Sequence, residues 1–126
     1  MVDTMSKIDK LNKALSDLQS SSPDVEATAV VSEDGLIMAS LLPRGVEEAQ
    51  VAAMSAAMLT IGSRTARELK RGAVEQIFVR GTDGYVVIMA AGPHAVLIGM
   101  ARREAKLGLL FLDASRAAEA IKTIIG

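Results

Sequence analysis

Residues 51–62, with the sequence VAAMSAAMLTIG, form an uncharged stretch in the middle of the 126-residue chain. Its polar side chains are Ser55 and Thr60. Acidic residues precede the stretch and basic residues follow it, an order that suits the helix macrodipole. They are Glu47 and Glu48 on one side and Arg64, Arg67, Lys70 and Arg71 on the other. The stretch therefore predicts a long central helix, which we expect to end at residues 71–72, where glycine is a common stop signal.

The predicted central helix is apolar on both sides, whereas a surface helix normally has one apolar stripe and one polar face. One stripe contains Val51, Met54, Met58 and Ile61, and the other side contains Ala49, Ala53, Ala56 and Ala57. We therefore expect two apolar neighbours, the helix's own sheet and a second copy of the protein. A span through a membrane takes about 20 apolar residues. The uncharged stretch is shorter, so we expect no membrane insertion.

The composition restricts the class of protein. Half of the residues are apolar, and the formal net charge of −1 gives no electrostatic basis for binding nucleic acid or an anionic membrane. Cysteine is absent, which excludes disulfides and zinc–thiolate sites. The first segment contains Asp3, Lys7 and Asp9, a charge pattern unlike that of a signal peptide. We therefore expect a cytoplasmic protein.

Apolar runs separated by turn residues predict three helices and five strands. The first and last helices are expected at 4–20 and 107–125, and the strands at 26–32, 36–40, 74–80, 85–91 and 95–101. Gly35 is expected to supply a positive φ in the first hairpin turn. This order of elements predicts an α+β domain with an antiparallel sheet. We expect a single domain over 1–126, with a helix and linker at 1–22 and the core at 23–126.

The strands differ in their pattern of apolar residues. The fourth and fifth strands are continuously apolar, which predicts that they lie in the middle of the sheet and are covered on both faces. In the third strand, Gln76, Phe78 and Arg80 share one face, and Ile77 and Val79 share the other. This mixed pattern predicts an edge strand, which must be protected or paired with another chain.

Residues that would carry out catalysis or bind a metal or cofactor are scarce. His94 stands alone in a Gly-Pro turn, and base catalysis requires a partner that orients the histidine. Metal sites need clustered ligands, and the adjacent acids Glu47 and Glu48 suit the first turn of a helix. The chain lacks the glycine-rich sequences that bind nucleotide phosphates. We assign no catalytic, cofactor-binding or metal-binding residue and expect a protein that is not an enzyme.

Four segments in this order and spacing resemble the Roadblock/LC7 family. They are AVVSEDGLIMAS (29–40), AQVAAMSAAMLTIGSRTARELKRG (49–72), EQIFVRGTDGYVVIMAAG (75–92) and AVLIGMA (95–101), and LGLL (107–110) then opens the last helix. The resemblance covers about residues 23–121. It implies a five-stranded antiparallel sheet with the long helix on one face and the terminal helices on the other. It also implies a homodimer in which the long helices pack together and the third strands pair.

The family resemblance implies a non-catalytic module that binds and regulates a small Ras-like GTPase, as in the prokaryotic members of the family. The protein is a candidate GTPase-activating protein, although we assign no arginine finger. Alternatives are a scaffold or dynein light chain-like adaptor, and a small-ligand sensory domain of the PAS or profilin-like type. The expected dimer contacts are Met54, Ala57, Met58, Ile61, Val74 and Phe78. Apart from the resemblance, Arg64, Arg67 and Arg71 are candidate contacts with an acidic partner, and the favoured alternative is that they form a solvated helix end that matches the macrodipole.

Overall fold

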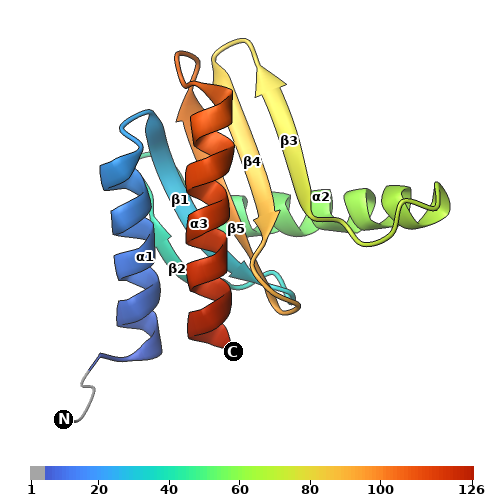
Figure 1. Cartoon of the computed structure of the whole chain (residues 1–126), viewed down its shortest axis with the longest axis horizontal. Helices are drawn as coiled ribbons and strands as arrows, with labels where there is room; N and C mark the ends of the chain where they lie inside the picture. The colour runs from blue at the N-terminus through green and yellow to red at the C-terminus, as the bar shows by residue number, and fades with distance from the viewer. Residues whose placement is uncertain (1–4) are drawn as a thin grey trace.

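Residues 5–126 of the chain form three helices and five strands. Figure 1 labels these elements on the computed structural model of the protein. The elements are α1 (Lys7–Ser21), β1 (Val25–Ser32), β2 (Ile37–Leu41), α2 (Glu48–Glu68), β3 (Gln76–Gly81), β4 (Gly84–Ala90), β5 (Ala95–Arg102) and α3 (Leu107–Ile125). The structure describes residues 5–126. The expected start of the first helix at Thr4 therefore lies outside the described residues.

The five strands form one sheet in the order β2-β1-β5-β4-β3, and every neighbouring pair is antiparallel. The last strand in the sequence, β5, occupies the centre because it pairs with both β1 and β4. This order confirms that the continuously apolar strands β4 and β5 lie inside the sheet. It also confirms that β3 is an edge strand.

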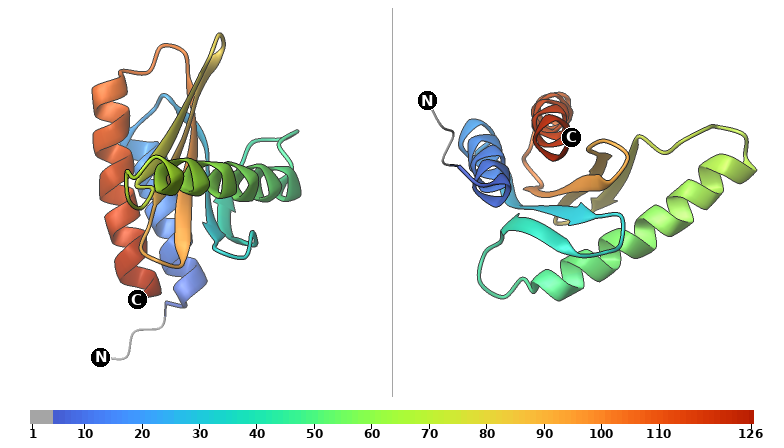
Figure 2. Two further views of the ribbon diagram at one scale, coloured as in Figure 1. Left: turned by 90° about the vertical axis from the view of Figure 1, so that its right-hand side faces the viewer. Right: turned by 90° about the horizontal axis from the view of Figure 1, so that it is seen from below.

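The helices form layers on the two faces of the sheet (Figures 1 and 2). Helices α1 and α3 cover one face, and the buried side chains there include Leu11, Leu15, Leu97, Leu110 and Ile121. Helix α2 covers the other face, where the buried cluster is smaller and consists of Ala29, Val31, Val51, Ala52, Ile88, Val96 and Ile98. The fold class and the layer arrangement expected from the sequence are both confirmed.

Helix α2 ends earlier than the sequence predicts. Its last residue is Glu68, and Lys70 has a φ of +58°, in the left-handed region. The Lys70 N–H donates to the Arg67 carbonyl, and the Arg71 N–H donates to the Ala66 carbonyl at 2.6 Å. These two bonds form a Schellman motif with a lysine in the position that glycine usually occupies. The expected stop at residues 71–72 was therefore wrong by three residues or more, because the chain leaves the helix before it reaches the glycine.

The hairpin between β1 and β2 follows the sequence prediction. Gly35 has a φ of +79°, as expected for its place in the turn. Within residues 5–126, no helix combines the length and the apolar character that crossing a membrane would require.

Candidate self-association surface

Helix α2 is longer than the sheet that it covers. Its 21 residues span about 31 Å, whereas five strands lying side by side span about 19 Å. Figure 2 shows that α2 crosses the strands and that its C-terminal part projects past β3. The crossing point with β3 is Gly62, where an added Cβ would lie 2.7 Å from Cδ1 of Ile77. The residues of α2 that follow this point are almost all exposed.

The side of α2 that faces the sheet differs from both predicted stripes. The buried residues are Val51, Ala52 and Ser55, with Met58 and Leu59 half-buried beside them. Ser55 is completely buried, and its hydroxyl donates to the Val51 carbonyl at 2.8 Å, which offsets the cost of burying a polar group. The sequence analysis placed Met54 and Ile61 on the same stripe as Val51. This prediction was wrong, because Val51 faces the sheet whereas Met54 and Ile61 are exposed.

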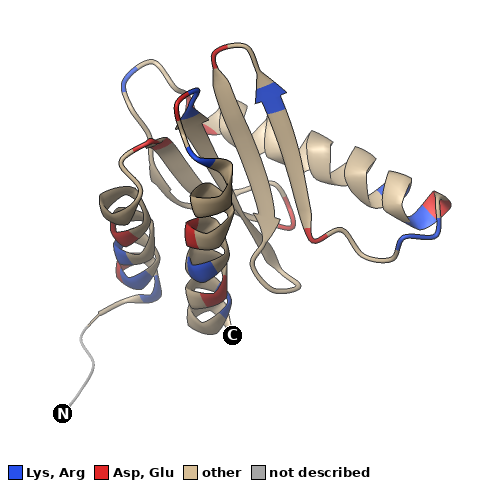
Figure 3. Cartoon of the chain, turned by 45° about the horizontal axis from the view of Figure 1, so that its top comes forward, with Lys and Arg blue, Asp and Glu red and all other residues tan. Residues whose placement is uncertain are grey.

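The outward side of α2 carries three of the expected dimer contacts. Met54 is 59% exposed, Ile61 is 65% exposed, and Ala57 is also exposed. Met54 and Ile61 lie seven positions apart, so only about 20° of helical rotation separates them. We call the surface formed by Met54, Ala57 and Ile61 the outer α2 face. Figure 3 shows no charged residue along the middle of α2, so the outer α2 face is uncharged, and its three side chains are exposed.

The other three expected dimer contacts lie elsewhere. Met58 is half-buried and packs against the inner cluster of its own chain. Val74 is also half-buried, and its Cγ2 lies 3.9 Å from the position of a Cβ added to Gly62. Phe78 is 36% exposed, but its ring lies on the opposite face of the sheet. Only the backbone of β3 therefore connects Phe78 with the outer α2 face.

The three aromatic residues of the chain form one cluster. The ring of Phe78 stacks on Tyr85, with 5.6 Å between the centroids, and meets Phe111 edge-on at 5.3 Å. Phe111 lies on α3 and Tyr85 on β4, so the cluster ties the edge strand β3 to the rest of the fold. Such aromatic pairs contribute about 0.5–1.5 kcal/mol beyond the area that they bury.

Replacing Phe111 with alanine should lower the free energy of unfolding by about 2 kcal/mol, because it removes the edge-on pair and part of the apolar contact. Chemical denaturation monitored by circular dichroism measures this change. Phe111→Leu, which keeps most of the apolar volume, should lose less than half as much. Equal losses for the two variants would show that the loss comes from the aromatic pair alone and that the apolar volume of Phe111 contributes nothing.

The two edge strands differ in how well they are protected. The β1–β2 pairing shifts register between Val30 and Val31, and this shift leaves Met38 without a partner in β1. A bulge of this kind twists an edge strand away from further pairing. In contrast, β3 pairs with β4 over six consecutive residues without a shift, and Val79 on this edge is 40% exposed. Strand β3 therefore offers the more regular template for another strand.

The basic residues expected to contact a partner lie at the projecting end of α2 (Figure 3). Arg64 binds Glu68 at 3.0 Å, while Arg67 and Arg71 are exposed. Arg67 also lines an open hollow of about 420 Å³ between α2 and the β4–β5 turn. Glu33 lines the same hollow, and its carboxylate already binds Nδ1 of His94 at 3.1 Å. We call Arg64, Arg67 and Arg71 the basic tip of α2. The outer α2 face and the basic tip thus lie along the same helix and just beyond its end.

Two hydroxyls beside the outer α2 face are already hydrogen-bonded within the helix. The hydroxyls of Thr60 and Thr65 donate to the carbonyls of Ala56 and Ile61. No group of three or more potential metal ligands occurs within residues 5–126. The hollow inside the α1–α3 side of the core measures about 10 Å³, close to the minimum for one water molecule. The surface therefore offers apolar packing and positive charge.

Residues 11–100 match the family profile described as the Roadblock/LC7 domain. The chain belongs to the Roadblock/LC7 family. It is 35% identical to the uncharacterized protein MJ1340 of Methanocaldococcus jannaschii over 100 residues, which are 79% of this chain and 87% of that protein.

Solved structures agree with this assignment of the fold. The structure of Myxococcus xanthus MglB has a TM-score of 0.88 at 17% identity, and the likeness covers 99% of this chain and 94% of that chain. The Roadblock/LC7 domain from Streptomyces avermitilis has a TM-score of 0.84 at 19% identity, with coverages of 90% and 96%. At these identities the likeness establishes a shared fold.

Proposed function

We propose that this protein is a homodimeric, non-catalytic adaptor that binds a small Ras-like GTPase in the cytoplasm and regulates it. Membership of the Roadblock/LC7 family and the likeness to the MglB fold support the proposal. The observation that carries it is the outer α2 face. Met54 and Ile61 are more than half exposed on a helix that projects beyond its own sheet. Monomeric proteins rarely leave large apolar side chains together on one open face.

A second copy of the chain fits the outer α2 face and the β3 edge at once. Two α2 helices that pack through Met54, Ala57 and Ile61 would approach closely, because Ala57 is small. The same two-fold axis would place the two β3 edges side by side and extend the sheet from one protomer to the next. Val74 and the backbone around Phe78 would then lie near the axis. This geometry keeps the five expected contacts other than Met58 close to the interface.

The basic tip of α2 is the proposed contact with the GTPase. A partner can regulate a GTPase by ordering or displacing the switch segments of the GTPase. This requires no catalytic residue from the partner. Arg67 and Arg71 are suited to acidic groups on such a surface because neither forms an ion pair with another described residue. Arg64 would need to release Glu68 first.

The GTPase contact is tested with the Ras-like GTPase encoded nearest to this gene, by titration calorimetry and by GTP turnover with and without this protein. Arg67→Glu should weaken binding about tenfold, because it places a carboxylate where an acidic partner is expected. Arg44→Glu, which changes an exposed arginine in the β2–α2 loop, is the matched control and should leave binding unchanged. If the wild type neither binds the GTPase nor alters its turnover, the protein acts as a scaffold without a GTPase.

A further inference from the structure

A glycine lies inside helix α2 at the point where the helix crosses the edge strand β3. Gly62 is well before the end of α2 at Glu68, and glycine is, apart from proline, the least favourable residue in a helix interior. A Cβ added to Gly62 would lie 2.7 Å from Cδ1 and 3.3 Å from Cγ1 of Ile77. Ordinary contacts between carbon atoms begin at about 3.5 Å. The missing side chain at Gly62 therefore allows α2 to approach β3 this closely.

Rotation of the Ile77 side chain can relieve only part of this contact. Turning χ2 moves Cδ1 away, but the position of Cγ1 depends on χ1, which is stiff in a β-branched residue. Ile77 is half-buried and packs against the inner cluster beneath α2. Cγ2 of Val74 lies 3.9 Å from the same added Cβ, so the space is limited on a second side. A side chain at Gly62 would therefore raise this part of α2 by up to about 1 Å.

Helix α2 is fixed to the sheet mainly through its first half. At its start the Ser40 hydroxyl donates to the Glu48 carboxylate at 3.0 Å, and Val51 and Ala52 are buried in the inner cluster. The residues of α2 that follow Gly62 are almost all exposed, and Figure 2 shows this part of the helix beyond β3. A lift at Gly62 would therefore tilt α2 about its buried first half.

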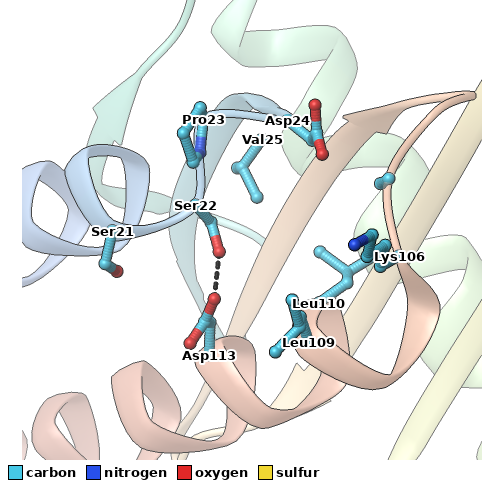
Figure 4. A pocket seen from close by; sticks show the side chains of 10 residues that line it. Ser21, Ser22, Pro23, Asp24, Val25, Lys106, Leu109, Leu110 and Asp113 are labelled. Carbon is cyan, nitrogen blue, oxygen red and sulfur yellow. Dashed lines mark hydrogen bonds between the residues drawn. The ribbon is translucent and has the colours of Figure 1, made fainter.

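The helices on the opposite face of the sheet are tied at more points. In the close view of Figure 4, the Ser22 hydroxyl at the end of α1 points toward the Asp113 carboxylate of α3 and donates a hydrogen bond to it. The Thr28 hydroxyl of β1 donates to the side-chain oxygen of Gln19 in α1 at 2.6 Å. A change at Gly62 should therefore move α2 and leave the layer formed by α1 and α3 in place.

We propose that Gly62 is a positioning residue for self-association, because it keeps α2 close enough to β3 for two copies to join through both elements at once. This inference rests on the homodimer proposed above, in which two α2 helices lie side by side over one continuous sheet. A tilt of one helix is matched through the two-fold axis by an opposite tilt of the other, so the two outer α2 faces diverge. The β3 edges cannot compensate, because paired strands keep a spacing of about 4.8 Å.

The same tilt has different consequences in the protomer and in the dimer. In a single protomer the projecting end of α2 is exposed, so a tilt breaks few contacts, and alanine itself favours the helix. In the dimer the tilt separates the outer α2 faces, which consist of Met54, Ala57 and Ile61. A residue that only fills the core of the protomer would weaken the protomer and the dimer together. Gly62→Ala should instead weaken the dimer without lowering the stability of the protomer.

Sedimentation velocity over a dilution series measures the dissociation constant of the dimer. Gly62→Ala should raise this constant about tenfold, within the usual range of coupling between residues in contact. The protomer is measured separately in the monomeric Ile61→Asp background, where Gly62→Ala should leave the melting temperature unchanged or raise it. Gly108→Ala is the matched control in α3, because no atom lies within 4 Å of the Cβ that it adds. This control should leave the dissociation constant unchanged.

A compensating change in β3 tests the contact itself. Ile77→Val deletes Cδ1, the atom nearest to the Cβ added to Gly62, and keeps a β-branched side chain in the strand. The double variant Gly62→Ala/Ile77→Val should recover most of the affinity that Gly62→Ala loses. Ile77→Val alone should self-associate like the wild type.

Three results would overturn the role of Gly62 while leaving the dimer intact. The first is a Gly62→Ala dimer as tight as the wild-type dimer, and the second is a double variant with no recovered affinity. The third is a lower melting temperature for Gly62→Ala in the Ile61→Asp background, which would make the glycine a packing requirement of the protomer. A wild type that is monomeric at micromolar concentration would instead overturn the proposed dimer, and the role of Gly62 with it.

Discussion

Ile61→Asp is expected to convert the dimer into a folded monomer. The wild type should have twice the 13.2 kDa mass of the chain at micromolar concentration, and the variant should have the mass of one chain. In the single protomer Ile61 is 65% exposed, so an aspartate there remains hydrated. In the dimer the same carboxylate would be buried without a partner, which costs about 3 kcal/mol or more and raises the dissociation constant more than roughly 100-fold.

Light scattering coupled to size-exclusion chromatography measures this change directly. Ile8→Asp is the matched control, because Ile8 is 58% exposed but lies on α1, across the sheet from α2. This variant should remain a dimer. Far-UV circular dichroism should show that both variants keep their helices. A wild type that is monomeric at micromolar concentration, or an Ile61→Asp protein that remains a dimer, would contradict the proposed interface.

Met58→Asp is a less informative variant, although the sequence alone places Met58 at the centre of the expected interface. Met58 is half-buried against Val51, Ile98 and their neighbours on the inner side of α2. A charge at this position would destabilise the protomer as well as the dimer, because it would lie against the apolar core. Loss of the dimer could then follow from unfolding. Met54→Asp avoids this problem, since Met54 is 59% exposed.

The order of the elements and the layers of the fold could be predicted from the sequence because these depend on patterns that extend over many residues. Continuous apolar character places β4 and β5 inside the sheet, and the mixed pattern of β3 places it at an edge. The rotation of α2 about its axis was predicted less well. Ser55 can face the core because the Val51 carbonyl accepts its hydroxyl. Thr60 and Thr65 make the same kind of bond and stay exposed, so the residue pattern alone does not tell which polar side chain faces the sheet.

Two further features depend on tertiary contacts that a single sequence does not reveal. Phe78 alternates with Ile77 in the strand, but only the structure shows that its side of the sheet is the one covered by α3, where its ring meets Phe111. The exposure of Leu109 and Leu112 on α3 was also missed, although the sequence contains a signal for it. Leu109 and Leu112 fall outside the apolar stripe that begins with Leu107 and Leu110. Large apolar residues outside a helix's buried stripe are a reason to look for a second surface.

Gly84→Ala is expected to destabilise the protein by about 3 kcal/mol and to lower its melting temperature by about 10 °C. Gly84 begins β4 with a φ of +154°, a conformation that other residues rarely adopt. A Cβ at this position would lie 2.5 Å from the backbone oxygen of Ala101 in β5. Because both atoms belong to the sheet, the clash cannot be relieved by rotating a side chain.

Gly108→Ala is the control for Gly84→Ala. Gly108 lies in the first turn of α3, and an added Cβ would meet no other atom within 4 Å. Alanine there should be neutral or should stabilise the helix by up to about 1 kcal/mol. Unfolding must be compared at equal protein concentration, because dimerisation itself contributes to stability. If the free energy of unfolding of Gly84→Ala lies within about 0.5 kcal/mol of the wild-type value, the hairpin accommodates the added Cβ at little cost.

The Gly84 substitution also links the sheet to the proposed assembly. Gly84 pairs with Gly81 at the end of β3, so a shift at this point moves the free edge that the second copy is expected to meet. Gly84→Ala should therefore weaken the dimer even under conditions where the protomer remains folded. Ile61→Asp should have the converse effect. It should abolish the dimer while leaving the hairpin of the protomer undisturbed. The mass of the assembly and the free energy of unfolding should be measured for both variants. Together they distinguish Ile61, a contact within the interface, from Gly84, which positions the backbone of the β3 edge.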